Sequence, residues 1–340
     1  MTPRARIGAV VLAVVVVTGV AVWAFTRGGD DDAEPGTGAP ARGPSELAVV
    51  AVRGTPNPLL AVVGTHPERP AAALVLPSGV TVVAPGQGET TIAGVAALPG
   101  ESIRIATSNA IGAWADHYGV VPIDTIAAEV DELGGLSVAL SEPATLDGTD
   151  LEAGEAELTG AQVVAYLSEP GEVAAQRWAE VLEALLAAEA FAPGMTEESD
   201  DAEAFADLLD AASGAAVEIP PVARVGETAA VLDQPPADDL VRELFGVRAP
   251  TPIVVQNGNG QPNVGEVVAS HLLPEGFRVV LSQNADTFRH RQTEIAATAG
   301  EFADEAEQVR ELLGVGRVVV SQVPSGLADI TIVVGRDFTA

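Results

Sequence analysis

Short, continuous runs of apolar residues, each bounded by glycine or proline, dominate the chain after residue 44. They span residues 47–52, 59–63, 71–76 and 80–83. Runs of this length without polar alternation are typical of strands that are buried on both faces of a sheet. The pattern therefore predicts four buried strands in this region.

The stretch from residue 158 to 186 combines an apolar run with helical periodicity. Trp178, Val181, Leu182 and Leu185 recur at i, i+3, i+4 and i+7, which places them on one face of an amphipathic helix. The preceding run VVAYL enters a loop at residues 168–171 that carries one carboxylate and no base. We expect this loop to be held rigidly, but it offers little catalytic chemistry.

A second helix is predicted over residues 126–133, where apolar side chains share one face. Asp124 or Thr125 can cap its start, Gly134-Gly135 can end it, and a strand at 136–140 follows. Asp116-His117-Tyr118 precedes this helix, and we expect it to form a surface turn.

Residues 188–239 are acidic and alanine-rich, and then interrupted by proline. They predict a helix at 202–209 and short strand pieces at 217–239. Four carboxylates stand just before the helix, but they lack the alternating spacing and the glycine of a calcium loop. We therefore expect a solvated helix start there and no metal site; these carboxylates are Glu197, Glu198, Asp200 and Asp201.

Residues 248–252 (RAPTP) mark a domain boundary, and a small α/β unit follows. Alternating strands and helices predict a layered sheet with helices packed on it. The expected strands are residues 252–256, 277–281, 317–321 and 329–334, and the expected helices are residues 264–273 and a second one striped by Phe302, Ala306, Val309 and Leu313.

The N-terminal run at residues 7–25 is uncharged and has nearly the ~20 residues that span a bilayer. Arg4 and Arg6 precede it and three aspartates follow, which places the N-terminus in the cytoplasm and the rest outside. The predicted anchor residues include Ile7, Val14, Trp23 and Phe25. Trp23 and Phe25 fit the aromatic belt at the membrane–water interface. The alternative is a cleaved signal peptide, whose apolar region would be shorter. Residues 28–44 consist mainly of Gly, Pro, Ala and Asp without apolar periodicity, which predicts a flexible stalk.

The amino-acid composition excludes several classes of binding partner and of chemistry. The chain has 48 acidic and 17 basic residues, a net charge of −31, and it contains no lysine and no cysteine. This charge disfavours nucleic acid, and the missing cysteines exclude disulfides and thiol chemistry. The four histidines, His66, His117, His271 and His290, are scattered, so the sequence predicts no histidine metal site.

Several segments resemble the LytR-CpsA-Psr family of envelope enzymes. Residues 116–138 (DHYGVVPIDTIAAEVDELGGLSV) resemble a family run of proline, hydrophobic positions and Val-Asp-x-Leu-Gly-Gly-Val. VVQNGNG, GFRVVLSQNAD and ADITIVVGRDF resemble the LytR C-terminal domain, which often follows the catalytic domain in actinobacteria. The resemblance implies an α/β chain with a transmembrane anchor (1–27), a stalk (28–44), an LCP-like α/β/α domain with a central sheet (45–247) and a LytR C-terminal-like domain (248–340).

The family's activity is phosphotransfer of glycopolymers from polyprenyl pyrophosphate carriers to peptidoglycan, using arginines and Mg²⁺. Where the family has its catalytic arginines and aspartates, this chain departs from the pattern at Ser78, Gly79, Ser168, Pro170, Gly171 and Ala174. Arg177 alone matches. The departures imply that the usual catalyst is lost, and Mg²⁺ would be needed only if the family activity is retained.

Arg177 and Arg104 are the candidate phosphate-binding residues. Arg177 could contact a phosphate bidentately, or it could pair with Glu180 or pack its stem beside Trp178. Arg104 does not belong to a recognisable phosphate-binding motif. Two glycine-rich segments, residues 85–88 and 257–260, could cradle an anion, but tight turns explain them as well.

Three functions remain open. The favoured one is a membrane-anchored scaffold, regulator or binder of cell-envelope components, such as polyprenyl-linked glycopolymer or peptidoglycan. The second is an active transferase with relocated arginines, for which Arg53, Arg69, Arg104 and Arg177 are the available sources. It requires three of them to gather around one pocket. The third is an interaction protein that works through its C-terminal domain.

Overall fold

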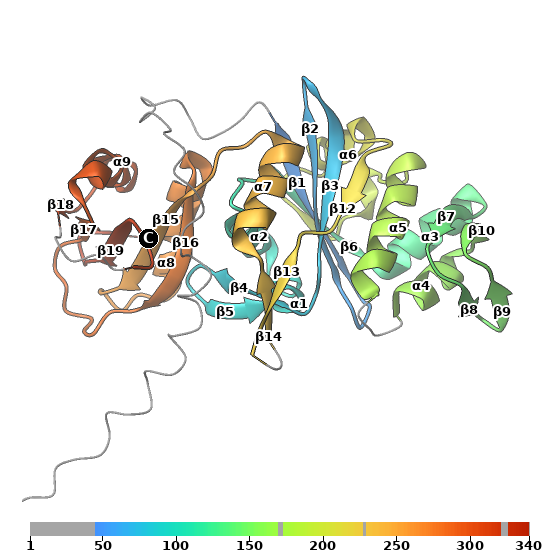
Figure 1. Cartoon of the computed structure of the whole chain (residues 1–340), viewed down its shortest axis with the longest axis horizontal. Coiled ribbons are helices and arrows are strands. Elements are labelled where there is room, and N and C mark those ends of the chain that lie inside the picture. Colours follow the sequence, from blue (N-terminus) through green and yellow to red (C-terminus); the bar gives the residue numbers. More distant parts are fainter. Residues whose placement is uncertain (1–44, 169–172, 227–228, 321–325, 340) are drawn as a thin grey trace, which may run out of the picture.

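The computed structural model describes residues 45–168, 173–226, 229–320 and 326–339. A six-stranded sheet forms the centre of the larger domain, in the order β11-β6-β1-β2-β3-β12 (Figure 1). Its strands are β1 (Glu46–Arg53), β2 (Leu59–His66), β3 (Arg69–Leu76), β6 (His117–Pro122), β11 (Glu198–Ser199) and β12 (Ala216–Glu218). β1, β2 and β3 pair antiparallel, whereas β1 and β6 run parallel.

The unbroken apolar runs of β1 and β2 reflect burial on both sides, as the sequence predicted. Ala48, Val50 and Val52 enter one hydrophobic core. Leu47 and Val49, which alternate with them, enter the other. The sheet is therefore covered on both faces.

Helices cover the two faces and make an α/β/α arrangement (Figure 1). One face carries α3 (Ile123–Leu133), α4 (Gly160–Ser168), α5 (Ala174–Ala187) and α6 (Ala202–Ala211). The other carries α1 (Ile92–Ala96), α2 (Gly100–Ile111) and α7 (Gln234–Phe245). The fourth predicted strand, β4 (Val80–Ala84), belongs to a separate four-stranded sheet with β5 (Gly88–Thr91), β13 (Val222–Val225) and β14 (Ala229–Leu232).

Short elements complete the larger domain. β7 (Leu136–Leu140) pairs with β10 (Gly154–Leu158), and β8 (Ala144–Leu146) pairs with β9 (Thr149–Leu151). The 3-10 helix η2 (Pro193–Met195) precedes β11.

The C-terminal domain contains one five-stranded sheet in the order β16-β15-β19-β17-β18. Its elements are β15 (Thr251–Asn257), α8 (Val264–Leu272), η3 (Leu273–Glu275), β16 (Phe277–Asn284), β17 (Glu294–Ala297), η4 (Gly300–Phe302), α9 (Ala303–Leu313), β18 (Arg317–Val320) and β19 (Ile330–Val334). The predicted strands and helices are confirmed, and β17 is an additional strand. The predicted stripe of Ala306, Val309 and Leu313 is buried.

Several local predictions are wrong. Asp116-His117-Tyr118 is not a surface turn, because β6 begins at His117 and pairs with β1 inside the sheet. α3 begins at Ile123 with Pro122 as its N-cap, so neither Asp124 nor Thr125 caps it. The strand pieces expected up to residue 239 end at β14, and α7 follows, with proline in its first turn.

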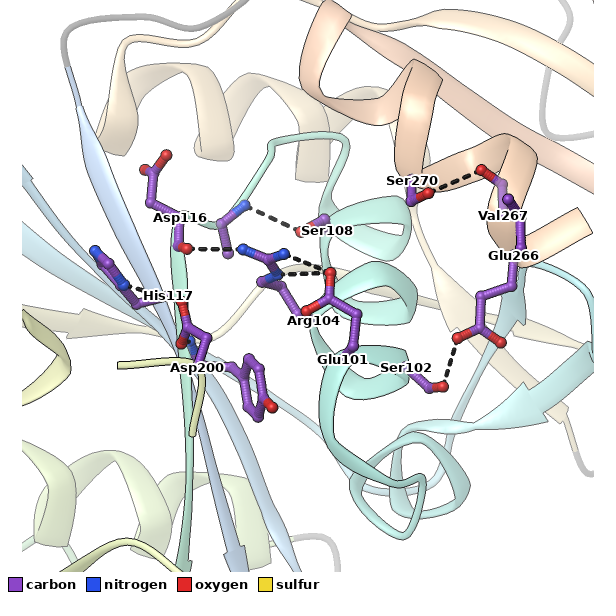
Figure 2. A network of polar contacts seen from close by, with 12 residues as sticks. Glu101, Ser102, Arg104, Ser108, Asp116, His117, Asp200, Glu266, Val267 and Ser270 are labelled. Carbon is purple, nitrogen blue, oxygen red and sulfur yellow. Dashed lines mark hydrogen bonds and ion pairs between the residues drawn. The ribbon is translucent and has the colours of Figure 1, made fainter. Parts of the chain in front are cut away.

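The two domains share a polar and apolar contact surface, here called the domain seam. Ile105 of α2 packs into the core of the C-terminal domain. Asn109 donates hydrogen bonds to Val83 O and Val279 O (both 2.9 Å) and accepts one from Val279 N (2.7 Å). Ser102 donates to Glu266 across the same seam (2.5 Å; Figure 2). The domains are therefore joined by specific side chains.

None of the helices within the described ranges is long and apolar enough to cross a membrane. The predicted anchor at residues 7–25 and the stalk at 28–44 lie outside those ranges.

Candidate functional site

Arg177 lies in the first turn of α5, where its guanidinium packs on an aromatic ring. Its Cζ is 4.7 Å from the ring centroid of Tyr166, and its Nη1 donates to Tyr166 O (3.1 Å). Cation–π packing and a carbonyl contact hold the charge against α4. The guanidinium is thus engaged by the protein itself.

Glu180, one turn further along α5, is a buried carboxylate that the sequence indicated only as a possible partner of Arg177. It is 8% exposed. Its oxygens accept hydrogen bonds from Tyr166 Oη (2.5 Å), Ser141 N (3.2 Å) and Gln176 Nε2 (3.3 Å). Burial, and then the hydrogen bond to Glu180, raise the pKa of Tyr166 above its ordinary value. The tyrosine therefore remains a neutral donor at neutral pH and cannot serve as a base.

Arg104 projects from α2 into a different network (Figure 2). Its guanidinium donates to the Glu101 carboxylate and to Asp116 O (2.8 Å), and it packs 4.6 Å from the Trp114 ring centroid. The ion pair with Glu101 already neutralises this cation.

Arg53 and Arg69, the other two candidate arginines, donate hydrogen bonds to backbone carbonyls at or near helix ends. Arg53 donates to Ala96 O (2.9 Å) and Leu98 O and lies 3.4 Å from Glu197. Arg69 donates to Arg242 O (3.0 Å) and Glu243 O (2.6 Å) at the end of α7. Both satisfy helix-end or loop carbonyls.

The three best-defined cavities among the described residues are not lined by Arg53, Arg69, Arg104 or Arg177. The first, about 160 Å³, lies between Val82 and Val231 of the larger domain and Val279 of β16. Arg278 also lines it, but this side chain is only 6% exposed and forms a bidentate pair with Asp238 (2.8 and 2.9 Å). Its charge is therefore compensated.

The carboxylates and histidines of the described chain do not fit a metal. No group of three His, Cys, Asp or Glu side chains there is arranged to hold one. His117 Nδ1 instead lies 3.1 Å from Asp200 Oδ2, and Asp201 caps α6, as expected for a solvated helix start. The described residues thus contain no preformed cage of three or more protein ligands for a metal, and no catalytic step is assigned to Mg²⁺.

The loop at residues 257–260 is stabilised by its own side chains. Asn257 Oδ1 accepts from Gly260 N (2.8 Å), and Asn257 Nδ2 donates to Gln261 O (2.7 Å). Gly260 adopts a positive φ of 81°. These contacts fit the tight turn better than the anion cradle.

Comparison with known proteins identifies the C-terminal domain. Residues 251–338 match the family model described as LytR cell envelope-related transcriptional attenuator. No curated protein matches the chain.

The larger domain is similar to solved LytR-CpsA-Psr structures. "TagT bound to LI-WTA" is 18% identical, with a TM-score of 0.50 over 60% of this chain and 91% of that chain. The "LytR-Csp2A-Psr enzyme from Actinomyces oris" is 18% identical, with a TM-score of 0.48 over 61% and 91%. "YwtF (TagT) with bound octaprenyl pyrophosphate lipid" is 16% identical, with a TM-score of 0.47 over 63% and 95%.

The resemblance predicted from the sequence is confirmed by these matches. The chain combines a mixed α/β domain with the fold of TagT and a LytR C-terminal domain. The comparisons thus show the fold of the larger domain and the family of the C-terminal domain.

Proposed function

We propose that this protein is a membrane-anchored, extracytoplasmic LytR-CpsA-Psr-like protein that binds or scaffolds cell-envelope components without catalysing phosphotransfer. The observation that carries the proposal is the separation of the candidate cations. Arg53, Arg69, Arg104 and Arg177 each contact different protein groups, and none of them lines the three best-defined cavities of the described residues.

Phosphoryl transfer needs several cations that surround the phosphates together, usually with Mg²⁺. Removing one such group typically costs ~10²–10³ in rate. Here Arg177 and Arg104 would both have to leave aromatic rings and hydrogen-bond partners to approach one phosphate. The residual rate of transfer should therefore be very low.

The ligand to test follows from the relatives. TagT is described with LI-WTA and with octaprenyl pyrophosphate lipid. We infer that a polyprenyl-linked glycopolymer or peptidoglycan is the partner class. The apolar run at residues 7–25 would anchor the chain in the cell membrane, and the net charge of −31 argues against nucleic acid.

The alternative function is an active phosphotransferase that attaches glycopolymers to peptidoglycan. It is supported by the fold and by Arg177, which stands at a position that matches the family pattern. An interaction protein that works through its LytR C-terminal domain is the third candidate.

Calorimetric titration of the full-length chain in mild detergent with a short polyprenyl pyrophosphate tests the proposal. We expect binding that is independent of Mg²⁺ and unchanged by Arg177→Ala. Arg310→Ala, which changes a partly exposed arginine on α9 of the C-terminal domain, is the matched control. Magnesium-dependent binding that Arg177→Ala weakens more than Arg310→Ala would contradict the proposal and favour the transferase. Absence of binding would favour the interaction protein.

A further inference from the structure

A cavity of about 150 Å³ opens at the domain seam, where four separate segments meet; we name it the seam pocket. The larger domain contributes the turn after β4, and the C-terminal domain contributes the start of α8 and the ends of β15 and β16. Its lining residues are Gly86, Gln87, Val255, Asn257, Asn263, Val264, Gly265, Ser282, Gln283 and Asn284.

One wall of the seam pocket forms where the backbone around Gly86 lies close to the backbone around Gly265. A Cβ added to Gly265 would lie 2.8 Å from Gly86 N, and one added to Gly86 would lie 2.9 Å from Glu266 N. Gly86 N also donates to Ser282 Oγ (3.0 Å). Two glycines therefore allow the turn of one domain to reach the first turn of α8 in the other.

The lining of the seam pocket is polar but uncharged. None of its ten residues is Asp, Glu, Lys, Arg or His, although 19% of the chain is charged. Six of them carry an amide or a hydroxyl group. The amides of Gln87, Asn263, Gln283 and Asn284 form no hydrogen bond to another residue in the described ranges. Their donors and acceptors are available to a ligand.

An anion does not match this pocket. The backbone N–H of Gly86 is bonded to Ser282 Oγ, and that of Gly260 is bonded to Asn257 Oδ1. No cationic side chain lines the cavity. The two glycine-rich segments therefore build a neutral wall and not a phosphate cradle.

We propose that the seam pocket binds a neutral sugar ring. Each amide side chain offers both a donor and an acceptor, as each sugar hydroxyl does, so the two sets of groups complement each other. A cavity of about 150 Å³ has the volume of an engineered cavity that binds benzene, so it holds the six-atom ring of a sugar while the ring substituents extend to the lining amides and through the cavity opening. A peptide would need a longer groove.

The proposal is independent of phosphate binding, because no residue of the seam pocket is a candidate phosphate-binding arginine. The seam pocket can therefore be tested separately: loss of sugar binding would leave pyrophosphate binding unaffected, and loss of pyrophosphate binding would leave sugar binding unaffected. A bound sugar would contact both domains at once.

Saturation-transfer NMR and calorimetry on the full-length chain in mild detergent test the seam pocket, with N-acetylglucosamine and glucose as neutral probes. We expect saturable binding with a dissociation constant on the order of 1 mM for at least one sugar. Asn263→Gly removes one amide while tolerating the left-handed backbone at this position (φ 59°). Gln87→Ala removes another from the opposite domain. Each should weaken binding roughly fivefold or more.

Gln308→Ala on α9 is the matched control, because it removes an exposed amide outside the pocket. It should leave the affinity unchanged. The proposal is overturned if neither sugar binds saturably, or if Asn263→Gly and Gln87→Ala bind as well as the control. Inorganic phosphate or a blocked trialanine peptide that binds in place of the sugars, with sensitivity to the same variants, would also overturn it.

Discussion

At the scale of single residues, the contact between Tyr166 and Glu180 shows how a polar pair is held inside the helical layer. Tyr166 is 2% exposed, and its hydroxyl donates to a carboxylate that also accepts from Ser141 N. Such buried groups stabilise the fold only while all partners are present.

This pair predicts an alkaline loss of stability. The folded-state pKa of Tyr166 lies above its ordinary value near 10, so the folded protein keeps a proton that the unfolded chain has lost. The stabilisation is complete below about pH 10 and is lost as the pH rises above it. Because the chain has no lysine and only two tyrosines, few other groups titrate in this range.

Tyr166→Phe should flatten this pH dependence, which urea unfolding between pH 8 and pH 11 can measure. At neutral pH the variant should lose about 1.5–3 kcal/mol, the usual range for a hydrogen bond to a charged group. Burial also raises the pKa of Tyr118, so Tyr118→Phe is the comparison. An unchanged slope in Tyr166→Phe would contradict the assignment.

At the scale of elements, a single glycine sets how closely α6 approaches the central sheet. A Cβ on Gly119 of β6 would lie 2.5–2.7 Å from three ring atoms of Phe205. Phe205 is 1% exposed and belongs to the core between α6 and the sheet. The helix therefore packs against a strand position that has no side chain.

Gly119→Ala should destabilise the protein by about 1–3 kcal/mol through overpacking. Denaturant unfolding measures this loss. Gly79→Ala is the matched control, because no heavy atom lies within 4 Å of its added Cβ. Phe205→Leu should partly rescue Gly119→Ala, and purely additive effects would show that the two positions do not collide.

Element prediction succeeded where one local signal decided the structure. The apolar runs became β1 to β4, and Gly134 ends α3 with a left-handed φ of 87°. It failed where packing decided. Asp116-His117-Tyr118 looks polar, yet β6 pairs with β1 there, and Asp200 accepts from Tyr118 N (2.9 Å). The prolines in the first turn of α7 are typical of breaks between strands, so the sequence pattern does not predict this helix, whose Val241 and Phe245 are buried.

At the scale of the whole molecule, Asn109 is the residue that most directly joins the two domains. It is 2% exposed and satisfies Val83 O of β4 together with both backbone groups of Val279 in β16. Loss of its side chain would leave these groups unpaired in a buried place.

Asn109→Ala should therefore weaken domain coupling by at least about 1–3 kcal/mol. In calorimetric scans we expect the wild-type domains to unfold together, and the variant to show separated transitions. Gln308→Ala controls for the loss of an exposed amide. Coincident transitions with an unchanged midpoint in Asn109→Ala would show that apolar contacts alone join the domains.

The sequence by itself determined the local structure and the class of the protein. Strand runs, helical stripes and glycine ends depend on neighbours within a few residues, and the family segments are read directly from the chain. The α-helices and most strands of the C-terminal domain were predicted for this reason, whereas β17 and the short 3-10 helices η3 and η4 were missed.

The tertiary structure alone decided what each candidate residue contacts. Arg104 meets Asp116 O and Trp114, Arg177 meets Tyr166, and Asn109 reaches Val279, 170 residues away. The uncharged lining of the seam pocket also exists only because Gly86 and Gly265 bring two domains together. Contacts between distant segments depend on packing, which local periodicity does not encode.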